Sequence, residues 1–178
     1  MKKLLSILTA ALALALAACA DRPSAPGPAE TAAQLPNPVA DAADASAFSR
    51  LGVAIDAPQG AEDVRYSIIA DKIAQVLFTC GGRAYTCRAA AAGEDISGVY
   101  EAFDDDVLST VVDADGYSVE VTTRTIGGGE NGALASWTCG AAQYTLHTGD
   151  AVNADDAAAL AALLAASTAE AAVATAAP

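Results

Sequence analysis

The chain has 178 residues, of which 53% are hydrophobic and 5% aromatic, and its 22 acidic and nine basic side chains give a net charge of −13. So acidic a surface repels nucleic acid and anionic lipid headgroups, which makes both poor partners, and no nucleic-acid partner is expected. The length is sufficient for one domain with a hydrophobic core.

The first eighteen residues, MKKLLSILTAALALALAA, have the form of a signal peptide. Lys2 and Lys3 form a basic start, and the apolar run that follows is too short to span a membrane as a stable helix. Residues 16–19 read LAAC, which resembles the lipobox of bacterial lipoproteins. This resemblance implies that Cys19 receives a diacylglycerol, that the chain is cut before it, and that acyl chains such as palmitate anchor the mature protein.

The residue after Cys19 is Ala20. In enteric lipoproteins an aspartate at this position is the usual signal for retention in the inner membrane. We therefore expect a protein of the cell envelope that is anchored to the outer membrane and faces the periplasm. Each buried methylene contributes about 0.8 kcal/mol, so a multiply acylated cysteine is a stable anchor. Removal of the signal peptide takes away two lysines, which changes the net charge from −13 to −15.

Residues 19–47 are predicted to be a lipidated, disordered tether, because they hold five of the seven prolines and little apolar mass beyond alanine. Residues 167–178 form a second low-complexity segment at the other end of the chain. The folded domain is therefore expected to span residues 48–166.

Short apolar or alternating runs predict the strands of this domain, because side chains on a strand alternate between two faces. The expected strands are 51–56, 65–70, 72–80, 83–90, 98–103, 107–112, 117–125, 133–138 and 142–147. Gly81-Gly82 predicts a two-residue hairpin turn, which places Phe78 opposite Tyr85 and Val76 opposite Cys87.

A helix is predicted to close the domain, with Asn153 as its N-cap and two aspartates in its first turn. Leu160, Leu163 and Leu164 fall on one face of it. The predicted fold is α+β, an antiparallel β-sheet of about six to eight strands with the C-terminal helix packed on it.

The segment LGVAIDAPQGAEDVRYSIIADKIAQVLFTCGGRAYTCRAA, followed by EDISGVY, resembles an uncharacterised family of bacterial envelope lipoproteins. The resemblance covers about 51–166 and includes the final hairpin and helix. It implies a domain tethered by a lipid or a membrane segment, in some members alongside anti-sigma-type regulators, and it carries no known activity. Cys87 stands where the family pattern has an aromatic residue, so no cysteine chemistry is carried over.

Three cysteines remain after lipidation, and an oxidising envelope favours a disulfide. Cys80 and Cys87 are four rungs apart in the expected hairpin, about 13 Å, whereas a disulfide needs α-carbons within about 7 Å. FTCG at 78–81 recurs as WTCG at 137–140, which favours a Cys80–Cys139 disulfide with Cys87–Cys139 as the alternative. Neither a Cys-x-x-Cys redox motif nor paired zinc-ligand spacing is present, so no metal or other cofactor is expected.

No catalytic constellation is apparent in the sequence. The single histidine, His147, is interpreted as a solvated strand end, and no motif places a serine beside it. The acidic runs at 104–106 and 113–116 fail the EF-hand spacing, and a weak surface calcium site remains an alternative. The aromatic residues of the two Thr-Cys-Gly hairpins are interpreted as core: Phe78, Tyr85, Trp137 and Tyr144.

These patterns predict a non-enzymatic, membrane-anchored binding or structural module, whose partner is the membrane through Cys19 together with an envelope protein or the cell wall. The alternative is a periplasmic ligand or peptide sensor linked to envelope stress signalling. An enzyme is the third possibility, for which the sequence offers no catalytic residues.

Overall fold

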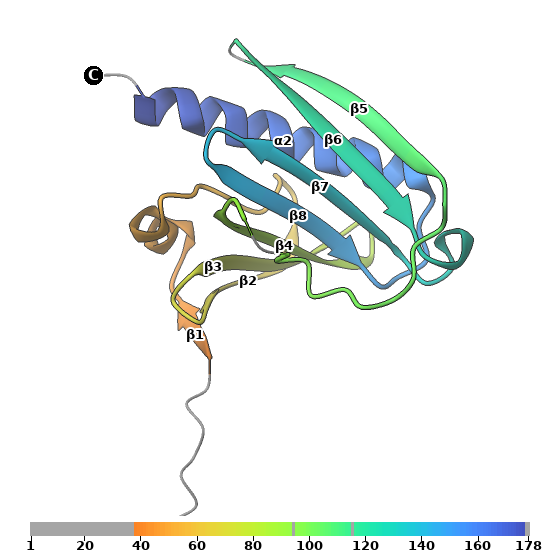
Figure 1. Cartoon of the computed structure of the whole chain (residues 1–178). Helices are drawn as coiled ribbons and strands as arrows, with labels where there is room; N and C mark the ends of the chain where they lie inside the picture. The colour runs from red at the N-terminus through yellow and green to blue at the C-terminus, as the bar shows by residue number, and fades with distance from the viewer. Residues whose placement is uncertain (1–37, 94, 115, 177–178) are drawn as a thin grey trace, which may run out of the picture. The chain divides into compact units, whose positions relative to one another are not determined.

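Eight strands and one long helix make up the described part of the chain (Figure 1). The structure is a computed structural model and describes residues 38–93, 95–114 and 116–176. The strands are β1 (Val39–Ala42), β2 (Glu62–Ile69), β3 (Ile73–Cys80), β4 (Arg83–Ala91), β5 (Val107–Ala114), β6 (Tyr117–Thr125), β7 (Ala133–Cys139) and β8 (Ala142–Thr148). The helical segments are the 3-10 helices η2 (Ala45–Leu51) and η3 (Gly127–Gly129) and the α-helix α2 (Ala154–Ala176). The predicted α+β fold is confirmed.

The strands form one antiparallel sheet in the order β1-β2-β3-β4-β8-β7-β6-β5. Two runs of sequential hairpins, β1–β4 and β5–β8, meet where β4 pairs with β8. The predicted register of the Gly81-Gly82 hairpin is confirmed, with Phe78 opposite Tyr85 and Val76 opposite Cys87. Since β4 lies in the middle of the sheet and β5 at its edge, the connection 92–106 has to cross the sheet (Figure 1).

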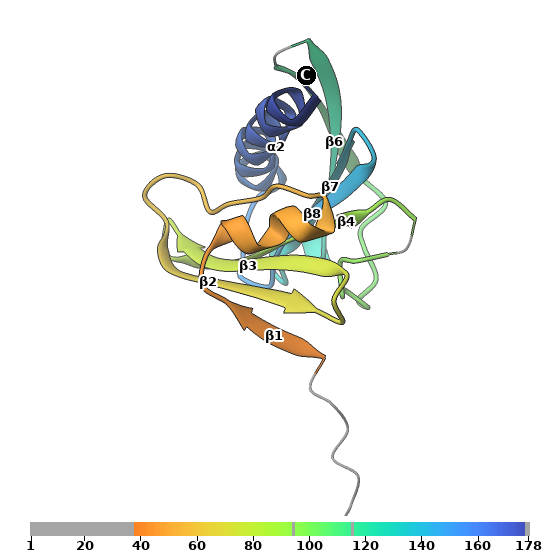
Figure 2. The ribbon, with the colours of Figure 1, turned by 90° about the vertical axis from the view of Figure 1, so that its left-hand side faces the viewer.

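One face of the sheet, the inner face, carries the core. Helix α2 packs against β5, β6 and β7 on this face, as Figure 2 shows from the side. The inward aromatic residues stack in pairs, Phe78 on Tyr85 at 5.6 Å and Trp137 on Tyr144 at 5.4 Å between ring centroids. All four are buried, so their prediction as core residues is confirmed.

Helix α2 begins as predicted and extends further than predicted. Asn153 Oδ1 accepts a hydrogen bond from the backbone N–H of Asp156 at 2.7 Å, and its side-chain amide donates to the Asp156 carboxylate at 3.0 Å, so the cap is reciprocal. The buried stripe consists mostly of alanine, which allows the helix to lie close to the sheet: Ala157, Ala161, Leu164, Ala165, Thr168 and Ala169. Leu163 lies outside this stripe and is 58% exposed, so the predicted face of Leu160, Leu163 and Leu164 is not the buried face of the helix. The predicted tail from 167 is also wrong, because α2 continues to Ala176.

The folded part begins earlier than the predicted residue 48. Residues 39–42 form β1, which pairs with the edge of β2, and η2 follows at 45–51. Asp44 caps η2 by accepting a hydrogen bond from the backbone N–H of Ser46, and Phe48 is fully buried against Tyr66. The last part of the predicted tether therefore belongs to the domain, while the signal peptide and the lipidation site, Cys19, lie outside the described residues.

Two predicted strands, 51–56 and 98–103, are not strands. In the first, Val53 and Ile55 are buried, but β1 and β3 occupy both sides of β2, so this segment cannot pair with the strand that follows it in the chain. In the second, Gly98 has a φ of +66°, which breaks the extended backbone. Alternating hydrophobicity therefore identified the buried Val53 and Ile55 without their pairing, whereas in 98–103 only Val99 is buried and Tyr100 is 94% exposed.

Candidate functional site

The three described cysteines are all free thiols, which contradicts the predicted Cys80–Cys139 disulfide. Cys80 pairs with Arg83 at one end of β4, whereas Cys139 pairs with Ala142, which faces Ala91 at the other end. Eight residues of strand separate these ends, about 26 Å at about 3.3 Å per residue. The two hairpin tips point in opposite directions because β4 and β8 are antiparallel.

The alternative Cys87–Cys139 pairing fails for the same reason, since Cys87 lies four residues from Ala91, about 13 Å along the strand. Cys87 is fully buried, and burial raises its pKa to about 12. Cys139 is buried against α2, where its Sγ lies 4.0 Å from the carbonyl oxygen of Thr168. Both thiols are therefore part of the core packing.

One residue of the acidic run 104–106, Asp104, is hydrogen-bonded within the fold. The carboxylate of Asp104 accepts hydrogen bonds from Thr125 Oγ1 at 2.6 Å and from the backbone N–H of Gly128 at 2.8 Å, and these bonds lower its pKa. This side chain fastens the start of β5 to the glycine turn at η3. Among the described residues, no group of three or more His, Cys, Asp or Glu side chains is placed to hold a metal ion.

The outer face of the sheet carries a row of polar side chains that sequence analysis missed. These residues are cross-strand neighbours in seven successive strands: Ser67, Gln75, Arg88, Thr145, Ser136, Thr122 and Ser109. The sequence shows one polar residue at an outward position of each of these strands. That these residues line up as a row follows only from the strand order and register.

The connection 92–106 lies over this row and is fastened to it by Arg88. The guanidinium donates from Nε to Gln75 Oε1 at 2.8 Å and from Nη1 to the carbonyl oxygens of Ile96 and Ser97 at 3.1 and 2.8 Å. Gln75 in turn donates to Ser67 Oγ at 3.1 Å. A Cβ at Gly98 would lie 2.2 Å from Arg88 Nη1, so only glycine leaves room for this contact.

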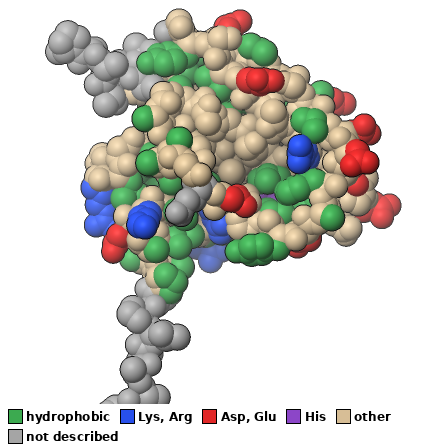
Figure 3. Space-filling model, in the orientation of Figure 1, with side chains coloured by type: hydrophobic (Ala, Val, Ile, Leu, Met, Phe, Trp, Pro, Cys, Tyr) green, Lys and Arg blue, Asp and Glu red, His purple; other side chains and the backbone are tan. Residues whose placement is uncertain are grey.

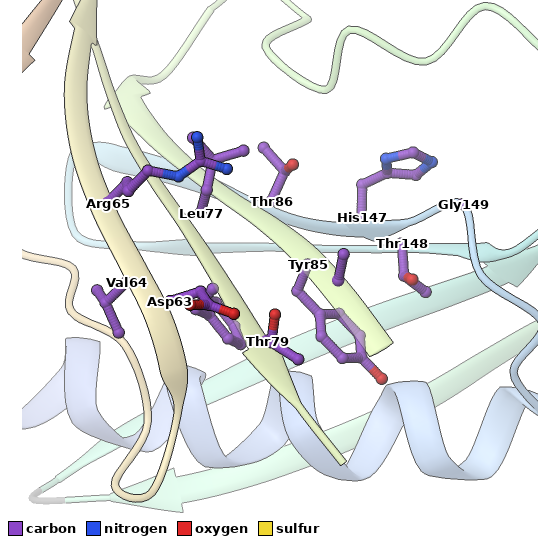
Figure 4. Close-up of a pocket in the computed structure, with 12 residues that line it drawn as sticks. Asp63, Val64, Arg65, Leu77, Thr79, Tyr85, Thr86, His147, Thr148 and Gly149 are labelled. Atoms are coloured by element: carbon purple, nitrogen blue, oxygen red, sulfur yellow. The ribbon is translucent and has the colours of Figure 1, made fainter. Parts of the chain in front are cut away.

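Beside this connection the outer face is hollowed into a groove of about 620 Å³ (Figure 4). Its floor is a second cross-strand row, in which Arg65 faces Leu77, Leu77 faces Thr86, and Thr86 faces His147. Neighbouring strands are about 4.8 Å apart, so the row spans about 14 Å. Figure 4 shows these four side chains on the same side of the sheet, with Tyr85 pointing to the other side.

The polar groups of this row are available to a ligand. Within the described residues, the side chains of Arg65, Thr86 and His147 form no hydrogen bond or salt bridge. Leu77 is half-buried between them and supplies an apolar surface. The groove therefore offers a cationic donor at one end, a hydroxyl in the middle and an imidazole at the other end.

His147 lies near the end of its strand, as predicted, but it is not fully solvated. It lies within β8, paired on both sides with Thr86 and Leu134, and it is half-buried. Burial lowers its pKa below the ordinary 6.5, against the opposing charge of Glu101. The imidazole is thus neutral at neutral pH and can donate one hydrogen bond and accept another.

Backbone strain occurs at the rim of the same groove. Asp63, which lines the groove, has a φ of +52°, and the pairing of β2 with β3 shifts register between Glu62 and Arg65. A non-glycine residue in the left-handed region costs about 1 kcal/mol or more, and such residues cluster at functional sites. The bulge also sets the position of Arg65 over the groove.

Comparisons with family models, curated proteins and solved structures find no match. The resemblance to envelope lipoproteins therefore stays a prediction. No helix among the described residues is long and apolar enough to cross a membrane.

Proposed function

We propose that this chain is a lipid-anchored binding module of the cell envelope, held at the outer membrane through Cys19, and that it binds a carboxylate-bearing peptide segment in the outer groove without catalysing a reaction on it. The observation that carries the binding role is the row of Arg65, Leu77, Thr86 and His147, whose polar groups have no protein partners within the described residues.

The side chains of the groove row determine which chemical groups a ligand needs. An exposed guanidinium pairs well with a carboxylate, and a hydrogen bond to a charged group contributes about 1.5 to 3 kcal/mol. The row spans about 14 Å, the length of about four extended peptide residues. Leu77 suits an aliphatic side chain in the middle of such a peptide, and His147 and Thr86 suit its backbone amides.

The binding role is tested by calorimetric titration of the full chain in detergent with an acetylated, aliphatic tetrapeptide that has a free C-terminal carboxylate. The same peptide with a C-terminal amide is the ligand control. We expect the carboxylate form to bind at least about tenfold more tightly, because the loss of one charged hydrogen bond costs about 1.5 kcal/mol or more.

Arg65→Met should abolish this preference, whereas Arg124→Met should keep it, because Arg124 does not line the groove and lies two strands beyond His147 in the same cross-strand row. Equal binding of the two peptides by the wild-type chain would refute the proposed ligand.

The anchoring role is tested separately by intact mass spectrometry of the protein extracted from its native membrane. We expect an acylated N-terminal Cys19, and Cys19→Ala should release the protein from the membrane fraction. An unmodified Cys19 in the extracted protein would contradict the anchor without bearing on the groove.

A further inference from the structure

An apolar cleft lies on the inner side of the sheet, between the C-terminal half of α2 and the segment 49–54. Its volume is about 610 Å³, and a smaller cavity of about 370 Å³ continues it along the same two elements, with Ser49, Val53 and Ala171 lining both. Figure 2 shows η2 and α2 on the same side of the sheet. Protein interiors are close-packed, so an opening of this size into the core is large enough to hold a small ligand.

The cleft carries no charge. Among the described residues that line it, none is acidic, basic or histidine, in a chain whose net charge is −13. Elsewhere on the surface, Figure 3 shows Asp and Glu gathered on one side of the view and most Lys and Arg on the other. An ionised group that enters the cleft would lose its hydration without gaining a partner, which is costly. The cleft therefore favours an uncharged ligand.

Three hydroxyl groups along the cleft and its continuation are already used within the fold. Each donates a hydrogen bond to the carbonyl oxygen three residues earlier in its own helix, at 2.8 Å: Ser49, Ser167 and Thr168. Asp56, at the smaller cavity, accepts from the Tyr66 hydroxyl at 2.6 Å and from the backbone N–H of Ala57 at 2.7 Å. The two walls therefore present mainly aliphatic groups to the space between them.

Tyr144 supplies a free donor to this space. Its ring stacks on Trp137 and is 4% exposed, and within the described residues its hydroxyl forms no hydrogen bond. A buried tyrosine hydroxyl usually has a partner. Among the described side chains only Thr123 Oγ1 is both enclosed and unpartnered, so the Tyr144 oxygen reaches open space, which on the inner face is the cleft. Burial raises the pKa of Tyr144 to about 12, so the hydroxyl stays a neutral donor.

We propose that the cleft binds one aliphatic chain of an uncharged ester lipid, with the hydroxyl of Tyr144 donating a hydrogen bond to the ester carbonyl oxygen. The chain lies against Leu51, Val53 and Ala142, and the glycerol hydroxyls stay in water at the opening. A free fatty acid has the same chain but carries a carboxylate, for which the cleft has no cationic partner. The groove of the proposed peptide ligand lies on the outer face, so this inference rests neither on that ligand nor on the anchor at Cys19.

The test uses the full chain in vesicles of diether phosphatidylcholine, which contain no ester carbonyl. The probe is monomyristoylglycerol with a photoreactive diazirine at the end of its chain, and mass spectrometry of peptides locates the cross-links. We expect them on segments 49–54 and 168–171. The matched alkyl-ether glycerol probe should cross-link at least about threefold less at equal concentration, because it lacks the accepting carbonyl.

Tyr144→Phe should lose this preference for the ester while keeping the stacked ring, and Tyr100→Phe is its control, because Tyr100 is 94% exposed. Ala54→Trp fills the cleft from an exposed position of its wall and should abolish most of the cross-linking. Ala102→Trp, at an exposed position that does not line the cleft, should leave it unchanged.

Cross-links that Ala54→Trp leaves unchanged would overturn the proposal, as would an ester preference that Tyr144→Phe retains or stronger cross-linking by a myristate probe. We expect equal cross-linking in wild type and Cys19→Ala. Cleft cross-links that appear only in Cys19→Ala would mean that the chain's own acyl group occupies the cleft, which would also overturn the proposal of a separate lipid.

Discussion

Arg88 fastens the connection 92–106 to the sheet, and its replacement by methionine tests this role most directly. Methionine keeps much of the length of the side-chain stem and removes the guanidinium. Three hydrogen bonds are lost, one to Gln75 Oε1 and two to the backbone carbonyls of Ile96 and Ser97. The middle of the connection then keeps its buried apolar side chains, Ile96 and Val99, while its ends stay hydrogen-bonded through Ala92 and Asp104.

The magnitude follows from the number and setting of these bonds. At about 1 kcal/mol each, three hydrogen bonds contribute about 3 kcal/mol. Part of the loss is offset, because Arg88 is half-buried and removing the guanidinium relieves the cost of its burial, which also lowers its pKa. We expect the free energy of unfolding to fall by about 2 to 3 kcal/mol, and Tm by about 4 to 12 °C for a domain of this size.

Urea denaturation of wild type, Arg88→Met and Arg124→Met measures this loss. Arg124 is an exposed arginine of the same face with no hydrogen bond or salt bridge within the described residues, so its replacement should change stability by less than about 0.5 kcal/mol. Hydrogen exchange should show faster exchange of the amides of residues 96–101 in Arg88→Met only. If Arg88→Met is as stable as Arg124→Met and its exchange is unchanged, the connection is not held by Arg88 and the reasoning is refuted.

Three further outcomes are expected. Maleimide should label Cys80 first in the native protein and Cys87 only on unfolding, because Cys87 is buried and its pKa is raised to about 12. Mass spectrometry of peptides gives the order of labelling. Rapid labelling of Cys87 in the native protein would contradict its burial in the core. Gly132→Ala should destabilise the fold by about 2 kcal/mol or more in urea denaturation, because its φ is +104° and the new Cβ would contact the Thr148 carbonyl oxygen. An unchanged denaturation midpoint would contradict this steric conflict. The wild-type free energy of unfolding should fall as pH drops below 6.5, because the lowered pKa of His147 leaves the unfolded state binding more protons. His147→Gln should lack the part of this fall that comes from His147. Identical pH profiles of wild type and His147→Gln would contradict a contribution of His147 to the pH dependence.

Local features of the fold were predictable from sequence where one interaction dominates. Gly81-Gly82 set the β3–β4 register, because a two-residue turn leaves one pairing that keeps Phe78 and Tyr85 on the same face. Asn153 set the start of α2, because its side chain satisfies an N–H that the helix leaves open. The continuation of α2 beyond residue 166 was not predicted, because a run of alanine with serine and threonine is also typical of a low-complexity tail.

The candidate site depended on long-range pairing and was therefore missed. Thr86 and His147 are 61 residues apart in sequence and become neighbours only because β4 pairs with β8. The same pairing separates Cys80 from Cys139, so the repeated Thr-Cys-Gly turns suggested a contact that the topology forbids. Short-range patterns do not determine which of several hairpins lie side by side.

The most direct test of the proposed groove uses the single histidine of the chain as its own reporter. His147 gives one imidazole Hε1 signal in the proton NMR spectrum, which needs no assignment because the sequence has no other histidine. During titration of the full chain with the acetylated tetrapeptide, this signal should shift and saturate with the free carboxylate form. It should shift far less with the amide form or in Arg65→Met. A saturating affinity in calorimetry with no movement of the His147 signal would place the ligand elsewhere and contradict the account.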